Sequence, residues 1–140
     1  MDNITRRFEL TLIGHYWDLV PEYSIHCNGI AICNKKKLPT KNNEAYIEKF
    51  EVDYNGPYIL DIYFRNKTTD QSVLNLNRNR LVRDMLLEVS YLTVDNIYVP
   101  INDNCVYYLS QSQMYQGSLV KNISGTSVMG FNGRLSINIP

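Results

Sequence analysis

The Asn28-Gly29 pair, which stands between two runs of alternating apolar and polar residues, limits the fold of this chain more than any other feature. Residues 23–27 (YSIHC) precede it and residues 30–33 (IAIC) follow it. Asn-Gly readily supplies the positive φ that both central positions of a type I′ turn require, and this turn joins antiparallel strands. The sequence therefore predicts an antiparallel hairpin at this point.

The same two-residue period appears near both ends of the chain. Residues 8–14 (FELTLIG) alternate between apolar and polar, and the closing run places Leu135, Ile137 and Ile139 at every second position. This period is typical of strands that bury one face. Residues 106–109 (VYYL) predict a further short strand.

A second hairpin is predicted around Asn55-Gly56-Pro57, between residues 45–54 and residues 58–64. In the first of these strands Ile47 is out of phase with the apolar residues that follow it, which predicts a bulge near Lys49.

The middle of the chain is less regular. Residues 65–83 are polar and predict a long loop, with a short strand over residues 73–76. Residues 85–99 resume the strand pattern, with a kink expected at Asp95-Asn96, and a helix over residues 80–90 is the competing prediction.

Short strands separated by turn signals every ~8–12 residues predict an all-β fold, an antiparallel β-sandwich of the jelly-roll type. The 140 residues fit a single β-sandwich domain spanning residues 1–140.

Composition narrows the function classes. Lys+Arg and Asp+Glu both number 14, so the formal net charge of +0 offers no basic excess for binding nucleic acid. No apolar run approaches the ~20 residues that span a membrane, and residues 1–7 do not resemble a signal peptide. The three cysteines are therefore expected to be reduced, with a Cys27–Cys33 bridge as the alternative.

The patterns of enzyme chemistry are missing from the sequence. His15 and His26 have no partners at the spacing of a zinc site, and no nucleophile elbow or phosphate-binding loop is present. The spacing of the acidic residues in the sequence does not by itself place any two carboxyl groups at the separation that glycoside hydrolysis requires. Acidic side chains in solvent at the surface are the simpler interpretation. We expect that the protein is not an enzyme.

The strongest candidate for a binding surface is the cluster His15-Tyr16-Trp17, which follows a predicted strand end and holds the single Trp of the chain. Exposed aromatic side chains stack on sugar rings or anchor protein interfaces. The alternative is that Trp17 closes one end of the core.

Tyr107 and Tyr108 are the second candidate. Adjacent residues in a strand point to opposite faces, so one of the two rings must point outward. An outward tyrosine suits an interface with a partner.

Two windows carry resemblances to known families. Residues 127–137 (SVMGFNGRLSI), together with residues 8–14 and 21–25, resemble small β-sandwich virion proteins of tailed phages of the marine or cyanobacterial type. Residues 83–95 (RDMLLEVSYLTVD) are similar to the Asp-containing strand pair of calcium-dependent, xylan-binding carbohydrate-binding modules. The resemblance implies a sandwich of the carbohydrate-binding-module type, with Asp84 as a calcium ligand and calcium as the one cofactor to be considered.

From these observations we predict a virion-associated structural protein, either a capsid decoration or a tail component, assembled in the cytoplasm of a host bacterium. Its expected partners are other virion proteins, and it is expected in several copies or as a homo-oligomer. The alternative is a carbohydrate-binding module that recognises glycans of the host surface.

Overall fold

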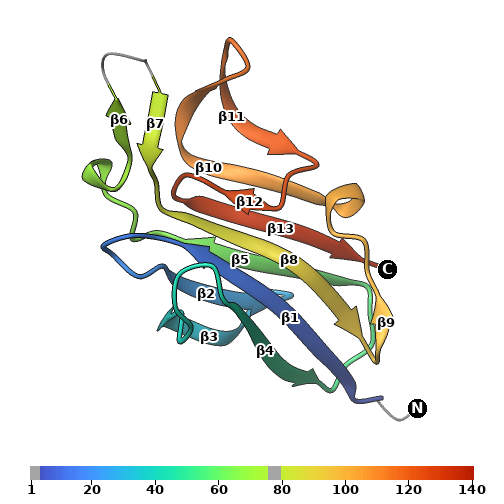
Figure 1. Cartoon of the computed structure of the whole chain (residues 1–140). Coiled ribbons are helices and arrows are strands. Elements are labelled where there is room, and N and C mark those ends of the chain that lie inside the picture. The colour runs from blue at the N-terminus through green and yellow to red at the C-terminus, as the bar shows by residue number, and fades with distance from the viewer. Residues whose placement is uncertain (1–3, 76–79) are drawn as a thin grey trace.

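The computed structural model describes residues 4–75 and 80–140, and most of them lie in antiparallel strands. Two sheets form two layers (Figure 1). The first sheet has the order β12-β8-β1-β4, with β9 paired to β8, and its strands are β1 (Arg6–His15), β4 (Ala45–Val52), β8 (Leu86–Val94), β9 (Ile97–Tyr98) and β12 (Val128–Met129). The second sheet has the order β11-β10-β13-β5-β2-β3, and its strands are β2 (Glu22–Cys27), β3 (Ile30–Lys37), β5 (Tyr58–Phe64), β10 (Cys105–Tyr115), β11 (Ser118–Ser124) and β13 (Gly133–Ile139).

The core lies between the two sheets and follows the alternation of the sequence. Strand β1 buries Phe8, Leu10 and Leu12, while β13 buries the predicted residues 135, 137 and 139 from the opposite layer. Facing apolar rows of this kind hold a sandwich together. The predicted antiparallel β-sandwich is confirmed. No helix among the described residues has the length and apolar character needed to cross a membrane.

The Asn28-Gly29 hairpin is confirmed, with φ of 50° and 80° at the two turn residues between β2 and β3. The second hairpin is wrong. β4 pairs with β1, whereas β5 pairs with β2 and β13, so residues 55–57 carry the chain from one sheet to the other. Turn residues mark a reversal of direction, but they do not specify which sheet the next strand joins.

The bulge near Lys49 is also wrong, because β4 pairs with β1 without a shift of register. Ile47 points outward, and the inward position beside it belongs to Glu48. The Glu48 carboxylate accepts hydrogen bonds from the Tyr23 hydroxyl at 2.7 Å and from Lys36 Nζ at 2.9 Å. The alternating pattern predicts an apolar residue at the inward position of residue 48. A buried carboxylate with these two partners takes its place.

The region predicted as a long loop contains a 3-10 turn, η1 (Thr69–Gln71), and a hairpin of β6 (Val73–Asn75) and β7 (Arg80–Arg83). The predicted short strand is thus found over Val73–Asn75, and its last residue, Leu76, lies outside the described residues. The alternative helix over residues 80–90 is wrong, since these residues belong to β7, β8 and the short link between them. Asp95 and Asn96 form the turn between β8 and β9 rather than a kink, with φ of 51° and 64°.

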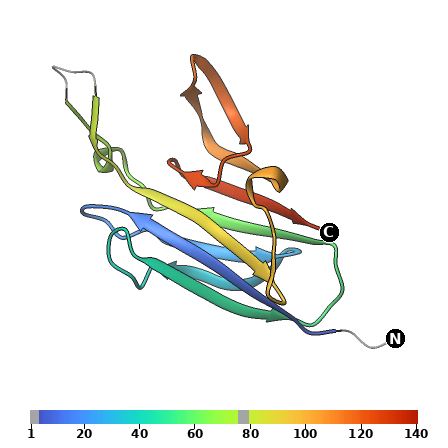
Figure 2. The same ribbon diagram turned by 45° about the vertical axis from the view of Figure 1, so that its right-hand side comes forward.

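The short strand predicted at residues 106–109 is the start of the longer β10, which turns at Gln116 and Gly117 into β11, a strand that the sequence analysis missed. A 3-10 turn, η2 (Asn102–Asn104), precedes β10. The β6–β7 and β10–β11 hairpins project from the same end of the sandwich in both views (Figures 1 and 2).

The three cysteines are free thiols, as expected, and the alternative bridge between Cys27 and Cys33 is not formed. The register pairs Cys27 with Ile30 and Cys33 with Ile25, so the two thiols are not opposite each other. Burial raises the pKa of each thiol, so a smaller share of each is present as the nucleophilic thiolate.

Candidate functional site

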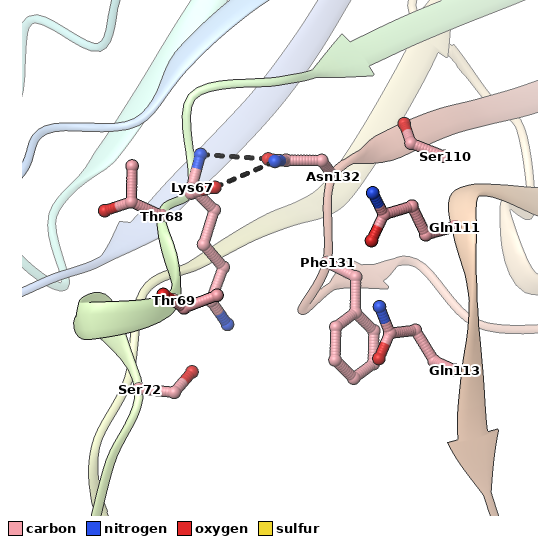
Figure 3. Close-up of a pocket in the computed structure, with 9 residues that line it drawn as sticks. All are labelled: Lys67, Thr68, Thr69, Ser72, Ser110, Gln111, Gln113, Phe131 and Asn132. Carbon is pink, nitrogen blue, oxygen red and sulfur yellow. Dashed lines mark hydrogen bonds between the residues drawn. The ribbon is translucent and has the colours of Figure 1, made fainter.

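An open groove of about 600 Å³ lies between the segment that follows β5 and strand β10 (Figure 3). Eight of the nine residues that line it have polar side chains, and the ninth adds an aromatic ring; the residues are Lys67, Thr68, Thr69, Ser72, Ser110, Gln111, Gln113, Phe131 and Asn132. Amide and hydroxyl groups both donate and accept hydrogen bonds. The groove therefore suits a ligand that carries many hydroxyl groups.

Asn132 joins the two sides of the groove. Its Oδ1 accepts a hydrogen bond from the backbone N–H of Lys67 at 2.9 Å, and its Nδ2 donates to the carbonyl of Lys67 at 2.8 Å (Figure 3). The side chain thus pairs with a backbone as a neighbouring strand would. This pairing fixes the distance between residues 67 and 132.

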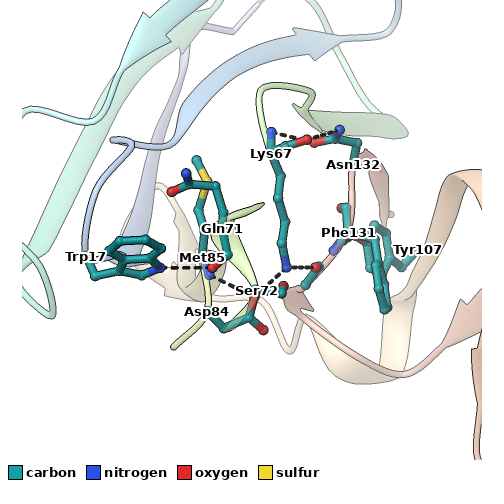
Figure 4. A network of polar contacts seen from close by, with 10 residues as sticks. Trp17, Lys67, Gln71, Ser72, Asp84, Met85, Tyr107, Phe131 and Asn132 are labelled. Carbon is teal, nitrogen blue, oxygen red and sulfur yellow. Dashed lines mark hydrogen bonds and ion pairs between the residues drawn. The ribbon is translucent and has the colours of Figure 1, made fainter. Parts of the chain in front are cut away.

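The ammonium group of Lys67 makes the second connection. It donates to Asp84 Oδ1 at 2.5 Å and to the carbonyl of Gly130 at 2.6 Å (Figure 4). Asp84 Oδ1 also accepts hydrogen bonds from Ser72 Oγ at 2.6 Å and from the N–H of Met85 at 2.8 Å. With a side chain only 9% exposed, Lys67 holds three separate segments together at the base of the groove.

Phe131 is the aromatic ring of the groove, and Tyr107 holds its backbone. The Tyr107 hydroxyl donates to the carbonyl of Phe131 and accepts from its N–H at 2.9 Å. Burial raises the pKa of Tyr107, so its hydroxyl stays protonated and able to donate.

The structure separates the two tyrosines that the sequence analysis selected. Tyr107 is 1% exposed and belongs to the core, so its contribution to a surface comes through Phe131. Tyr108 is the ring that points outward, and the guanidinium of Arg134 lies over it at 4.6 Å from the ring centroid.

Trp17 lies outside the groove, on the other side of residues 71 and 72 in Figure 4. It is 42% exposed and is not a plug of the core. Its Nε1 donates to the carbonyl of Gln71 at 2.9 Å, and the guanidinium of Arg83 lies 5.0 Å from the ring centroid. Trp17 therefore supports the segment that forms one wall of the groove.

His15 and Tyr16, the other two residues of the predicted cluster, contact the loop between β3 and β4, and His15 also contacts β8. Both ring nitrogens of His15 have hydrogen-bond partners, Asn43 Oδ1 at 2.6 Å and Glu88 Oε1 at 3.1 Å. The Tyr16 hydroxyl donates to the carbonyl of Thr40 at 2.8 Å. The structure thus brings neither residue to the groove, and their role in binding stays a prediction.

Asp84 is the predicted calcium ligand, and its surroundings do not fit this ion. Calcium takes about six to eight oxygen ligands, usually with several carboxylates. Within residues 4–75 and 80–140, no three His, Cys, Asp or Glu side chains gather into a metal-binding group. Three donors already occupy Asp84 Oδ1, and one of them is the ammonium of Lys67, which would repel a metal ion.

The sequence analysis missed the groove itself. Phe131 and Asn132 belong to the motif that carried the family resemblance, but they were not selected as site residues. Ser110, Gln111 and Gln113 lie beyond the predicted end of their strand. The polar run of residues 110–113 (SQSQ) was the signal that could have extended the strand and pointed to an open polar surface.

Comparison with known proteins places the fold. No protein-family model matches the chain, and no curated protein matches it in sequence. The selenomethionine form of vCBM60, solved in a study of circular permutation between two families of calcium-dependent carbohydrate-binding modules, has a TM-score of 0.61 at 11% identity, over 95% of this chain and 90% of that one. A second structure, vCBM60 in complex with galactobiose, has a TM-score of 0.54 at 9% identity, over 94% of this chain and 97% of that one.

These two likenesses show that the chain has the β-sandwich fold of carbohydrate-binding modules, which confirms that part of the predicted resemblance. At such low identity the likeness concerns the fold alone. The virion origin has no support from these comparisons and stays a prediction.

Proposed function

We propose that the protein is a carbohydrate-binding module that holds a glycan in the groove around Phe131. The observation that carries this proposal is the combination of one aromatic ring with amide and hydroxyl side chains in a single open groove. An aromatic face packs against the C–H groups of a sugar ring, and amides and hydroxyls exchange hydrogen bonds with its hydroxyl groups. The fold supports the proposal, because both structural neighbours are carbohydrate-binding modules and one is in complex with galactobiose.

The role we propose is binding without catalysis. Glycoside hydrolysis generally uses a pair of carboxyl groups on either side of the bond that breaks. The residues that line the groove include no Asp or Glu, and the nearby Asp84 is bonded to Lys67. The lining offers hydrogen bonds and an aromatic surface, which serve recognition.

Glycan-array screening followed by calorimetric titration of each hit tests this function. Phe131→Leu keeps an apolar side chain but removes the aromatic face, and we expect it to weaken binding about three- to tenfold. Gln111→Ala combined with Gln113→Ala removes amide partners from an exposed strand and should weaken binding to a similar degree.

Tyr91→Leu is the matched aromatic control, because Tyr91 lies on the outer face of the first sheet and does not line the groove. We expect this variant to bind the same glycan with unchanged affinity in its folded state, as verified by circular dichroism. Loss of binding in a folded Trp17→Ala variant with full binding in the Phe131 variant would move the site to the cluster at residues 15–17. Absence of binding to every glycan would reject the function.

A protein-docking role, including the virion role predicted from the sequence, is the second candidate. Tyr91 and Tyr98 stack at 5.1 Å between ring centroids on the outer face of the first sheet, and both are about half exposed. Ile97, which precedes Tyr98 in β9, is 71% exposed. Exposed aromatic and aliphatic side chains of this kind favour a protein partner. Light scattering that finds a stable multimer, together with no glycan binding, would favour this candidate.

A further inference from the structure

A second hollow of about 290 Å³ adjoins the groove and has a different chemistry. Ser110 lines both of them, and the remaining lining residues of the second hollow are Tyr63, Arg65, Tyr108, Gly133 and Arg134. It lies on the outer face of the second sheet, where Arg134 is paired across the strands with Tyr63 on one side and with Tyr108 on the other. We refer to Tyr63, Arg65, Tyr108 and Arg134 as the arginine-tyrosine strip.

Each arginine of the strip lies over a tyrosine ring. Arg134 is 4.6 Å from the centroid of Tyr108, and Arg65 is 4.3 Å from the centroid of Tyr63. Stacking uses the flat face of a guanidinium group and leaves the N–H donors at its edge free to bind an acceptor. The rings thus hold two sets of planar donors in place at the surface.

Neither arginine is paired with a carboxylate within the described part of the chain, although Arg6, Arg7, Lys36, Lys49 and Lys67 all are. Asp61 lies on the same outer face, two residues before Tyr63, and it accepts a hydrogen bond from Ser136. His26 lies 5.1 Å from Tyr63 between ring centroids. Glu22 is a second acidic residue on this face, because it continues the β2–β5 register to the position opposite Arg65. Among the described residues, neither Asp61 nor Glu22 forms an ion pair with an arginine of the strip. The two guanidinium groups are therefore available to an acidic ligand.

We propose that the arginine-tyrosine strip binds the acidic group of an anionic glycan, a uronate carboxylate or a sulfate ester, on the chain whose neighbouring sugar occupies the groove. The inference rests on the proposed function and names its ligand class. The edge of a guanidinium group matches the two oxygens of a carboxylate or sulfate, and the tyrosine rings offer apolar surface to the sugar. Ser110 lines both hollows, so the two share a border at this residue.

Matched pairs of glycans test the ligand class. Oligogalacturonate is compared with its methyl ester, which has the same backbone without the charge, and dextran sulfate is compared with dextran. We expect the wild-type protein to bind the acidic member of at least one pair about tenfold more tightly than the neutral member. The pair that shows the preference identifies the acidic group as carboxylate or sulfate.

Variants then locate the preference. Arg134→Gln combined with Arg65→Gln should remove the tenfold advantage of the acidic glycan and leave the affinity for the neutral one unchanged. Arg7→Gln combined with Lys49→Gln is the charge-matched control, because both residues lie on the other sheet with side chains that are 80% and 69% exposed. Phe131→Leu should weaken binding of both members equally.

The outcomes separate the two proposals. The strip proposal is wrong if the wild-type protein binds the acidic and neutral members equally. It is also wrong if the control variant with changes at Arg7 and Lys49 loses the preference as much as the strip variant does. In both cases glycan binding in the groove stands. If the wild-type protein binds none of the four glycans and no glycan on the array, both proposals fail.

Discussion

Lys67 is the side chain on which the shape of the groove depends most. Its backbone pairs with Asn132, and its ammonium bonds to Asp84 and Gly130. Because the ion pair is largely buried, the charge of each partner is compensated mainly by the other. Removal of one partner therefore lowers the free energy of unfolding by more than the intact pair contributes to it.

We expect Lys67→Met to lower the free energy of unfolding by about 3 kcal/mol, since it leaves the Asp84 carboxylate buried without its cation. Urea denaturation followed by circular dichroism measures this loss. The double variant Lys67→Met, Asp84→Asn should recover part of it, because no unpaired charge is left.

Lys49→Met is the control for this prediction. The Lys49 side chain is 69% exposed and lies 3.9 Å from Glu9, so its loss should change stability by less than about 0.5 kcal/mol. Equal stability of the Lys67 and Lys49 variants would show that the Lys67–Asp84 pair does not hold the groove together.

Strand β13 leaves no room for a side chain at its first residue, Gly133, where it packs against β10. Gly133 is paired with Leu109, and a Cβ atom at residue 133 would collide with the carbonyl oxygen of Tyr108 and crowd the Tyr107 ring at 3.0 Å. Backbone atoms cannot yield as a flexible side chain can. The glycine thus allows β13 to start beside Phe131 and Asn132.

Gly133→Ala is expected to lower the free energy of unfolding by about 1–3 kcal/mol, the range for an overpacked site. Gly130→Ala is the matched control three residues earlier, where the nearest neighbour of a new Cβ is the end of the Leu86 side chain at 3.3 Å. Thermal unfolding of both variants tests the difference. A Gly130 variant that loses as much as the Gly133 variant would contradict this explanation.

The groove lies where one end of the second sheet meets the segment between β5 and β6, because its lining residues belong to β10, to the two positions before β13 and to that segment. Asp84, which the resemblance implied as a calcium ligand, is bonded to the ammonium group of Lys67. The cation beside this carboxylate is therefore a lysine of the same chain.

We therefore expect calcium to leave the unfolding temperature unchanged. A ligand present at a hundredfold excess over its dissociation constant stabilises the native state by about 2.7 kcal/mol, which for a chain of this size is a shift of several degrees. Thermal scans in excess EDTA, in CaCl₂ and in MgCl₂ at equal ionic strength make the comparison. A rise of several degrees in calcium alone would show that the protein has a calcium site.

Local patterns in the sequence predict much of the fold. Alternation in residues 8–14 and 135–139 identifies two core strands, and Asn28-Gly29 identifies the β2–β3 hairpin, because both signals arise within a few consecutive residues. The prediction fails at Glu48, where a charged residue takes a buried position. Its partners, Tyr23 and Lys36, lie in β2 and β3, and no local pattern reveals them.

The site is less predictable than the fold for the same reason. From the sequence, Trp17 was a candidate exposed aromatic residue with a core position as the alternative, and one of Tyr107 and Tyr108 had to point outward. Trp17 and Tyr108 are the exposed rings, but no local pattern could place either relative to a groove. The groove exists because Asn132 pairs with Lys67, 65 residues earlier in the chain. Strand periodicity and turn chemistry are properties of neighbouring residues, so the sequence by itself determines the all-β sandwich. The binding surface depends on which distant strands pair, and the packing of the two sheets alone decides that.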